Sequence, residues 1–404
     1  MKSKLLLVMF TAMTCLLSQF SSAQTRYMDS VFAGYTMDSV TYSTVYGLKM
    51  DIYQPAGDTA AIRPLIVLAH GGSFVSGTRE DDNTIIALCI DFAHKGYVTA
   101  SIDYRLIADP GNFLNGDSAA TEVFRAVGDG KAAVRYFHEY ADSFKIDTNN
   151  VFIGGNSAGA VLFDQYAFID SLNELPHALQ LDVVGNAGGF DGNSGNAGYS
   201  EGFKAVINLA GGLNDPSWIG YCSKPIVSAQ GTLDSVVPYT CMDPVVDGFP
   251  VPLQLCGLGS MQSYITTNTP YWASMIFPGA GHVPWSTSPT DYYMIDTLIT
   301  SFLYKELYNL VPDTCPTPSG IKNVTSATIK LYPNPAGKQL NIESSDIISA
   351  ITMSDEMGRT VSRTSDIDSR NYEMNTSGLS AGIYFIRIYS TSGLLPVVRK
   401  VIIE

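Results

Sequence analysis

The chain has 404 residues, of which 46% are hydrophobic and 15% are charged. This length permits a large buried core, and the apolar content is typical of globular proteins rather than disordered ones. The net charge of −14 argues against nucleic acid or an anionic membrane surface as a partner, because both would repel an acidic protein.

Residues 1–23 predict a secretory signal peptide. Lys2 and Lys4 precede an apolar run that ends at Leu17, and the small residues of 21–23 suit a cleavage site. The run is too short to be a membrane span. We therefore predict an exported protein without a transmembrane segment, in which disulfides can form.

Strands that alternate with helices are expected over 27–310, which we predict to be one catalytic domain. Antiparallel entry strands within 42–55 come first. The elements expected next are strand 64–69, helix 83–95, strand 97–103, helix 119–144, strands 151–154, 204–209, 225–230 and 272–277, and a last helix over 291–310. This alternation predicts an α/β fold, a mostly parallel sheet with helices on both faces.

The pattern GxSxG occurs three times, around Ser157, Ser200 and Ser380. A nucleophile elbow needs a strand, a tight turn and then a helix, so that the serine oxygen projects above the sheet. Ser157 follows a short apolar run and precedes a plausible helix. The other two serines precede strand-like segments, so we predict Ser157 as the nucleophile and assign the others to turns.

A serine hydroxyl needs a base to take its proton, and the base needs an acid to orient it. His282 follows the predicted strand 272–277 and the flexible sequence PGAG, which suits the base. Two other histidines fall in helical patterns, one follows the elbow helix, and one opens a glycine-rich loop; these are His94, His138, His177 and His70.

The acid should follow a strand and lie between the serine and the histidine in the chain. Asp234, in QGTLDSVVP, meets both conditions. Asp215 and Asp243 are its rivals, although the sequence NDPSW around Asp215 indicates a turn or a helix cap. We predict Asp234 as the acid.

The HGGSF sequence at 70–74 follows a predicted strand and is suited to bind a developing oxyanion. Backbone N–H groups must already point at that oxygen, and glycines permit the required backbone conformations. We expect these N–H groups to come from Gly72, Ser73 and Ala158. Asp103, in SIDYRL, is expected to anchor a loop near the site.

With these residues in place, the region from about 40 to 310 resembles secreted α/β-hydrolase carboxylesterases, including feruloyl- and acetylxylan-esterase-like enzymes. HGGSF, SIDYRL, GNSAG, GTLDSVVPY and PGAGHVPW carry the resemblance. It implies a serine ester hydrolase that works through an acyl-enzyme, with no metal and no organic cofactor. Ser73 replaces the third glycine of the HGGG pattern, and the acid motif resembles that of dienelactone-hydrolase and prolyl-oligopeptidase relatives. The substrate stays open, with carbohydrate-linked acyl esters as one class.

Only the short segment 211–224 separates two strands where many lipases carry a helical lid. This predicts an open cleft, suited to a bulky or polymer-attached acyl group. Four aromatic residues of the motif loops are candidates to line it, with a place in the core as the alternative: Phe74, Trp218, Tyr239 and Trp285.

Two other functions compete with an esterase. A serine exopeptidase of the same fold would need an acidic or polar subsite for a free terminus. A non-catalytic surface or adhesion protein would carry an intact triad by coincidence.

A change of character follows residue 310. Segment 311–326, with PDTCPTPSG, predicts a linker, and 327–404 predicts a small β-sandwich. Its expected strands are 329–332, 339–343, 350–354, 383–388 and 397–403. LYPNP, GLSAGIYFIRI and VVRKVIIE resemble the C-terminal sorting domain of type IX secretion cargo. That resemblance implies export through the periplasm to the surface or medium, with the secretion machinery as partner.

Six cysteines become five once the signal peptide is removed. Cys89 lies in an apolar helix-like segment and is predicted to be a buried thiol, which leaves four with three possible pairings. Cys222 precedes the strand 225–230 and Cys241 lies beyond its other end. That strand spans about 20 Å, whereas bridged α-carbons lie within about 7 Å. We predict Cys241–Cys256, and a second bond joining Cys222 to Cys315.

Overall fold

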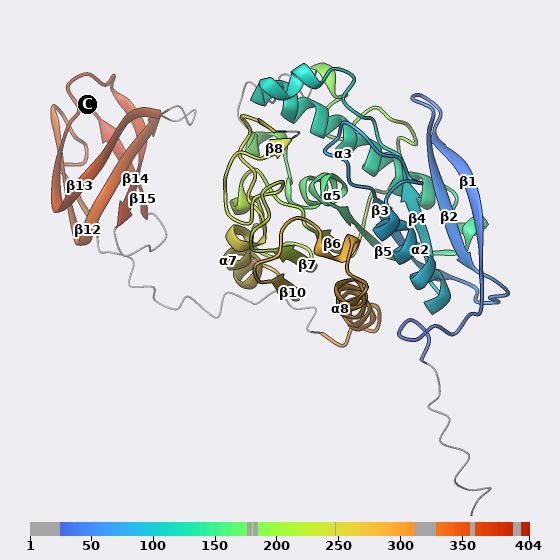
Figure 1. Ribbon diagram of the computed structural model, residues 1–404. Helices are drawn as coiled ribbons and strands as arrows, with labels where there is room; N and C mark the ends of the chain where they lie inside the picture. Colours follow the sequence, from blue (N-terminus) through green and yellow to red (C-terminus); the bar gives the residue numbers. More distant parts are fainter. Residues whose placement is uncertain are drawn as a thin grey trace, which may run out of the picture. The chain divides into compact units, whose positions relative to one another are not determined.

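The computed structural model describes residues 25–175, 180, 185–246, 248–311, 329–355, 360–390 and 397–404. The chain divides into two compact units, Met1–Pro316 and Thr317–Glu404 (Figure 1). The predicted signal peptide, the predicted linker beyond residue 311, His177 and Cys315 lie outside the described residues. In the part of the chain that is described, no helix is long and apolar enough to cross a membrane.

An eight-stranded sheet forms the centre of the first unit (Figure 1). The strands, in spatial order, are β1 (Tyr35–Ser43), β2 (Leu48–Pro55), β4 (Val98–Ile102), β3 (Arg63–Ala69), β5 (Ile146–Asn156), β6 (Ala205–Leu209), β7 (Ile226–Gly231) and β10 (Trp272–Phe277). The pairs β1–β2 and β2–β4 are antiparallel, and every other pair is parallel. The carboxyl ends of β3, β5, β7 and β10 therefore meet at one edge of the sheet, where ligand sites of such folds form.

Helices cover both faces of this sheet, as predicted. The described helices of this unit are α2 (Asn83–Lys95), α3 (Gly116–Glu139), α4 (Ala141–Phe144), α5 (Ala158–Phe168), α7 (Leu258–Asn268) and α8 (Pro289–Leu307), with short 3-10 turns η1 (Pro110–Leu114), η2 (Leu172–Glu174), η3 (Pro216–Trp218) and η4 (Pro284–Ser286). Along β3, Leu65 and Val67 belong to the hydrophobic cluster that includes buried residues of α3, α5 and α7, while Ile66 and Leu68 belong to the cluster that includes buried residues of α2 and α8. Both faces are buried, which explains the continuous apolar run of that strand.

Two helices differ from the expectation. The predicted helix 119–144 is two helices, because the backbone of Tyr140 (φ −103°, ψ 25°) leaves the helical region between α3 and α4. Helix α7 was not predicted at all. Its buried residues are only Leu258, Met261 and Ile265, so its apolar stripe is narrow, although their spacing is helical.

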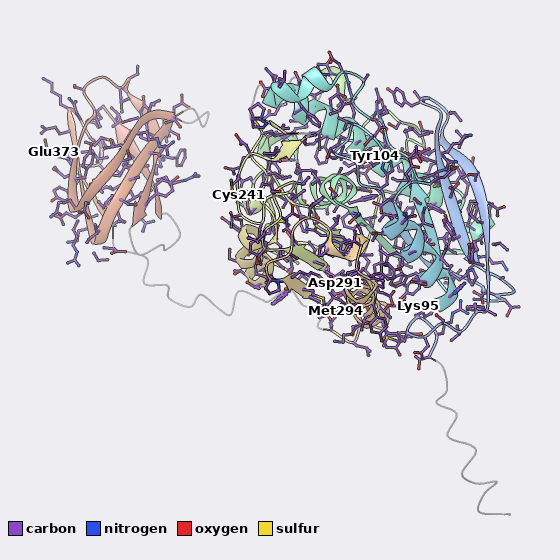
Figure 2. All side chains as sticks on the ribbon, in the orientation of Figure 1. Lys95, Tyr104, Cys241, Asp291, Met294 and Glu373 are labelled. Atoms are coloured by element: carbon purple, nitrogen blue, oxygen red, sulfur yellow. A yellow bond between two sulfur atoms is a disulfide. The ribbon has the colours of Figure 1, made fainter. Side chains whose placement is uncertain are left out.

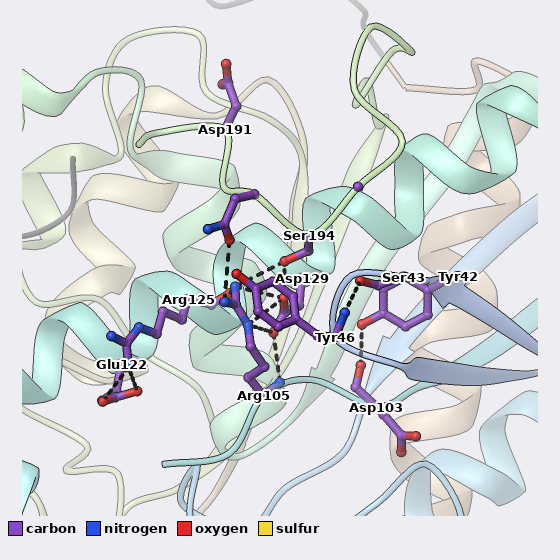
Figure 3. A network of polar contacts seen from close by, with 12 residues as sticks. Tyr42, Ser43, Tyr46, Asp103, Arg105, Glu122, Arg125, Asp129, Asp191 and Ser194 are labelled. Atoms are coloured by element: carbon purple, nitrogen blue, oxygen red, sulfur yellow. Dashed lines mark hydrogen bonds and ion pairs between the residues drawn. The ribbon is translucent and has the colours of Figure 1, made fainter. Parts of the chain in front are cut away.

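Buried charged side chains of α3 make hydrogen bonds and ion pairs to the Gly/Asn-rich segment 188–201. Asp129 accepts hydrogen bonds from Arg105 Nε (2.9 Å) and from the Ser194 hydroxyl (Figure 3). Lys131 Nζ donates to the Phe190 carbonyl at 2.9 Å, and further along α3, Arg135 makes an ion pair with Glu201, also at 2.9 Å. Fixed partners of this kind offset the cost of burying charge, and they give an irregular segment one conformation.

The second unit is a five-stranded antiparallel domain, in line with the predicted small β-sandwich. Its strands are β11 (Ile329–Tyr332), β12 (Gln339–Asp355), β13 (Thr360–Asn375), β14 (Gly382–Ser390) and β15 (Val397–Ile403). The expected strands 339–343 and 350–354 are one long strand, whose register shifts between Glu343 and Ile348. Strand β13 was missed because its sequence is mostly polar.

The LYPNP motif is tied to the last strand through one side chain. Asn334 Nδ2 donates to the Lys400 carbonyl at 3.1 Å, and Asn334 Oδ1 accepts from the Ile402 N–H at 2.9 Å. Two of the three motifs that suggested a sorting domain are thus in direct contact.

Candidate active site

Ser157 lies at the sharp turn between β5 and α5, with φ 53° and ψ −118°. Two glycines permit this turn. A Cβ built at Gly155 would lie 2.4 Å from the Gly159 carbonyl carbon, and one built at Gly159 would lie 2.1 Å from the Ala69 carbonyl oxygen. No larger residue fits at either position, which is the physical reason for the GxSxG pattern at an elbow.

Three side chains from three loops form one hydrogen-bonded chain. His282 Nε2 lies 2.7 Å from Ser157 Oγ, and His282 Nδ1 lies 2.8 Å from Asp234 Oδ2. The other carboxylate oxygen accepts from the N–H groups of Val236 (3.0 Å) and Val237 (3.1 Å), which fixes the orientation of Asp234. With the Nδ1 proton shared with the carboxylate, Nε2 is free to accept the serine proton.

The alternative candidates for the acid, the base and the nucleophile lie elsewhere in the structure. Asp215 accepts from the Ser217 N–H at 2.8 Å and caps η3, while Asp243 is exposed. His94 and His138 lie on α2 and α3. The serines of the other two GxSxG matches lie outside strand-turn-helix settings, and Ser200 Oγ accepts from the Gly202 N–H instead.

The predicted oxyanion loop has three successive residues with positive φ: Gly72 (119°), Ser73 (54°) and Phe74 (62°). A Cβ built at Gly72 would lie 2.0 Å from the Ser76 carbonyl oxygen, so that position requires glycine. Ser73 and Ala158 line the same cavity as Ser157. Within the described residues, neither of their N–H groups donates to another protein atom, which leaves both available to an oxyanion.

The buried side chain of His70 holds the first residues of this loop in place. Its ring is buried and stacks on Tyr104, with centroids 4.3 Å apart, and its Nδ1 lies 2.6 Å from the Gly71 carbonyl oxygen. Burial lowers the pKa of His70, so the ring is held neutral. Arg79 follows this loop in the chain and makes an ion pair of 3.0 Å with Asp103, which agrees with the expected role of Asp103 as an anchor for a loop near the site.

Asp82 and Asn156 join the three loops that carry Gly71, Ser157 and His282, and the sequence patterns predicted a role for neither. Asp82 Oδ2 accepts from the Gly71 N–H at 2.9 Å and from Asn156 Nδ2 at 3.0 Å. Asn156 Oδ1 in turn accepts from Trp285 Nε1, on the loop that follows His282, at 3.1 Å. The available signals were an aspartate directly before a predicted helix and an asparagine directly before the nucleophile.

We expect Asp82→Asn to lower kcat about ten- to a hundredfold with little change in KM. The new NH₂ group would face two donors, Gly71 N–H and Asn156 Nδ2, so the loops would lose their shared acceptor. Steady-state kinetics on any cleaved ester tests this. An exposed carboxylate on α4, which lines neither recess beside Ser157, supplies the control, Asp142→Asn, for which both constants should stay unchanged. A lower melting temperature with unchanged kcat would contradict a positioning role.

Two recesses flank Ser157. One is apolar, and none of the described residues that form its walls is charged; these are Ser73, Phe74, Phe113, Ala119, Val123, Ser157, Ala158, Val161, Asn214, Val236, Val237, Pro244, Val246, Val251, Leu253 and Leu255. The other is polar and includes His70, Gly71, Gly72, Ser73, Gly77, Asp81, Asp82, Asn83, Thr84, Asn156, Ser157, Val236, His282, Val283 and Ser286. An ester bond at Ser157 would thus have an apolar and a polar side.

Of the four aromatic candidates, Phe74 lines the apolar cavity and the other three have different positions. Trp285 is 2% exposed, packs against Phe277 and hydrogen-bonds Asn156, so it belongs to the core. Trp218 is buried beside a separate recess. Tyr239 is half-buried, where a Cβ at Gly259 would contact its ring.

The open cleft expected from the short 211–224 segment stays a prediction, but one further segment contributes to the site. Residues 241–256, which we call the flap and which follow the Asp234 loop, add five side chains to the wall of the apolar cavity. The predicted Cys241–Cys256 disulfide closes its base (Figure 2 labels Cys241). Cys222 is also disulfide-bonded. Cys89 is a buried free thiol as predicted, and burial raises its pKa to about 12.

Comparison with known proteins finds a family match in each unit of the chain. Residues 50–215 match the BD-FAE family. They lie within the α/β-hydrolase fold described above. Residues 330–404 match the secretion system C-terminal sorting domain family. The hydrolase expectation and the sorting-domain expectation are thereby confirmed, and a sorting domain implies export to the surface or medium.

Individual relatives of the hydrolase domain are distant. An AB hydrolase superfamily protein of Schizosaccharomyces pombe is 29% identical over 143 residues, which cover 34% of this chain and 38% of that protein. This chain thus matches about two fifths of that relative's length. Similar solved structures include an esterase of Thermogutta terrifontis with propionate bound (18% identical, TM-score 0.46, covering 70% of this chain and 97% of that one) and its paraoxon-phosphorylated form (20%, 0.46, 70% and 97%).

Proposed function

We propose that this protein is a secreted serine carboxylesterase that works through an acyl-enzyme. The observation that carries the proposal is the continuous hydrogen-bonded chain from Ser157 Oγ through His282 to Asp234. Free N–H groups beside the nucleophile support it, since acyl transfer needs them where negative charge develops.

In this mechanism Ser157 Oγ attacks the ester carbonyl while His282 Nε2 takes its proton. The carbonyl oxygen becomes an oxyanion and accepts hydrogen bonds from the N–H groups of Ala158, Ser73 and Gly72. His282 then gives its proton to the leaving alcohol, and the acyl group stays on Ser157. Water repeats the sequence with His282 as base and releases the acid.

The polar recess supports an alcohol with many hydroxyl groups, such as a carbohydrate. Side chains that can donate to or accept from hydroxyls include Asp81, Asn83, Thr84 and Ser286. Carbohydrate-linked acyl esters are therefore the substrate class that we propose for the alcohol side.

The apolar lining of the recess beside Ser157 disfavours a serine exopeptidase. An aminopeptidase substrate would bring an ammonium group beside the acyl carbon, and burying it without a carboxylate is costly. None of the described residues that line the cavity is acidic. A carboxylate-bearing acyl group meets the same obstacle, because no basic residue is among the described residues of the cavity wall either.

A panel of p-nitrophenyl acyl esters, feruloyl sugar esters and aminoacyl amides tests the function. We expect cleavage of esters, no cleavage of amides, and labelling of Ser157 by a sulfonyl fluoride, located by peptide mass. Preferential cleavage of aminoacyl amides would favour the exopeptidase. No turnover together with an unlabelled Ser157 would favour a surface or adhesion protein.

We further propose that the sorting domain directs export through the periplasm by the type IX machinery. Deleting the chain beyond about residue 319 should leave an active hydrolase that stays in the periplasm, since every proposed catalytic residue precedes that point. Cell fractionation with an ester assay measures this. An inactive, unfolded truncated protein would instead make the tail part of the enzyme's core.

A further inference from the structure

The flap is a hairpin whose two limbs pair along their length. Strand β8 (Val245–Val246) pairs with β9 (Phe249–Pro250) near the tip. Met242 and Leu255 exchange backbone hydrogen bonds of 3.1 and 2.9 Å nearer the base. The Cys241–Cys256 disulfide then closes the limbs covalently. A hairpin of this size is marginal by itself, so the covalent link contributes to its order.

Contacts along its second limb hold the flap beside the cavity. At its base, Cys256 exchanges backbone hydrogen bonds of 2.8 and 3.0 Å with Leu213, and Asn214 Nδ2 donates to the Gln254 carbonyl at 2.6 Å. At the start of α3, a Cβ built at Gly116 would lie 2.4 Å from the Pro252 carbonyl oxygen. The flap therefore bridges the loop after β6 and the N-terminal end of α3.

The inward side of the flap is one wall of the apolar cavity. Its contribution is Pro244, Val246, Val251, Leu253 and Leu255. The opposite wall comes from η1, α3 and α5, and Ser157 with Ser73 and Ala158 closes the reacting end. On β8 the two faces are distinct, because Val246 lines the cavity whereas its neighbour Val245 is 42% exposed.

We propose that the flap is the acyl-selectivity element of this enzyme, and that the site accepts an uncharged apolar acyl chain lying between the flap and α3. This deepens the proposed esterase function and rests on it. The length of chain that fits is set by the inward flap residues, and the disulfide keeps those residues in place. An acyl group longer than the cavity would have to displace the flap, whose base is closed by the Cys241–Cys256 disulfide.

The experiment measures kcat/KM for p-nitrophenyl acetate, butyrate, hexanoate and octanoate with the full chain. In Val246→Phe, the ratio of hexanoate to acetate should fall about tenfold or more, since a methylene in an apolar pocket is worth that much discrimination. Val246→Ala should raise the ratio. The matched control is Val245→Phe, on the outer face of the same strand, which should leave the ratio within about twofold of the unaltered chain.

A second arm tests the tether. The double variant Cys241→Ser with Cys256→Ser leaves the other disulfide intact, and it should shift the preference toward longer chains. If the ratio of hexanoate to acetate kcat/KM is unchanged in this double variant, the disulfide has no part in selectivity.

The Val246 variants decide the main proposal. If both behave like Val245→Phe, the flap is not the wall of the acyl site and the proposal is overturned. If Val246→Phe does not fold, Val246→Ala decides alone. An unaltered chain that cleaves none of the esters would instead refute the esterase function itself.

Discussion

Ser157→Ala should abolish ester hydrolysis, with kcat reduced at least about ten-thousandfold. The substitution removes only the attacking oxygen, and the left-handed backbone at this position is already occupied by a residue with a Cβ. We expect His282→Ala to be equally severe, because the serine proton then has no acceptor. Steady-state kinetics with an ester cleaved by the unaltered chain measures both.

The two losses should not add. Since Ser157 and His282 act in the same proton transfer, the double variant should be about as inactive as either single one. Thermal melting followed by circular dichroism distinguishes the loss of a catalytic group from loss of the fold. The melting temperatures of all three variants should stay close to that of the unaltered chain. Appreciable turnover in Ser157→Ala would mean that another group is the nucleophile.

Asp234→Asn should lower kcat by about ten-thousandfold while the loop keeps its conformation. The amide oxygen can still accept from the Val236 and Val237 N–H groups, so the loop geometry survives. Its NH₂ group, however, would donate to His282 Nδ1. That would place the imidazole proton on Nε2, where it faces Ser157 and prevents proton abstraction.

Asp215→Asn and Asp243→Asn are the matched controls, because both were rivals in the sequence and neither contacts His282. Near-normal kcat is expected for each. If Asp234→Asn stayed active while either control lost activity, the assignment of the acid would be wrong.

Local patterns were enough to predict much of this fold. The strand 64–69 and the helix 83–95 lie within one residue of where they were expected, since the strand is a continuous buried run and the helix has a clear apolar period. The strand 272–277 was also placed correctly, from its apolar sequence, although it lies at the sheet edge and only Phe277 is buried. The triad residues could be chosen because chain order and the strand-turn-helix setting restrict each one. The length of a parallel strand argued against Cys222–Cys241, and the predicted Cys241–Cys256 bond is present.

The flap, the joining role of Asp82 and the position of Trp285 depend on the tertiary structure. Residues 241–256 carry little periodicity, and their shape comes from pairing between limbs and docking on Leu213 and Gly116. Asp82 was readable as a helix cap, but its bonds to Gly71 and Asn156 join segments up to 74 residues apart. An aromatic residue in a motif loop can face a cavity or the core with the same sequence around it. Which one occurs depends on partners far away in the chain, and a local pattern holds no information about them.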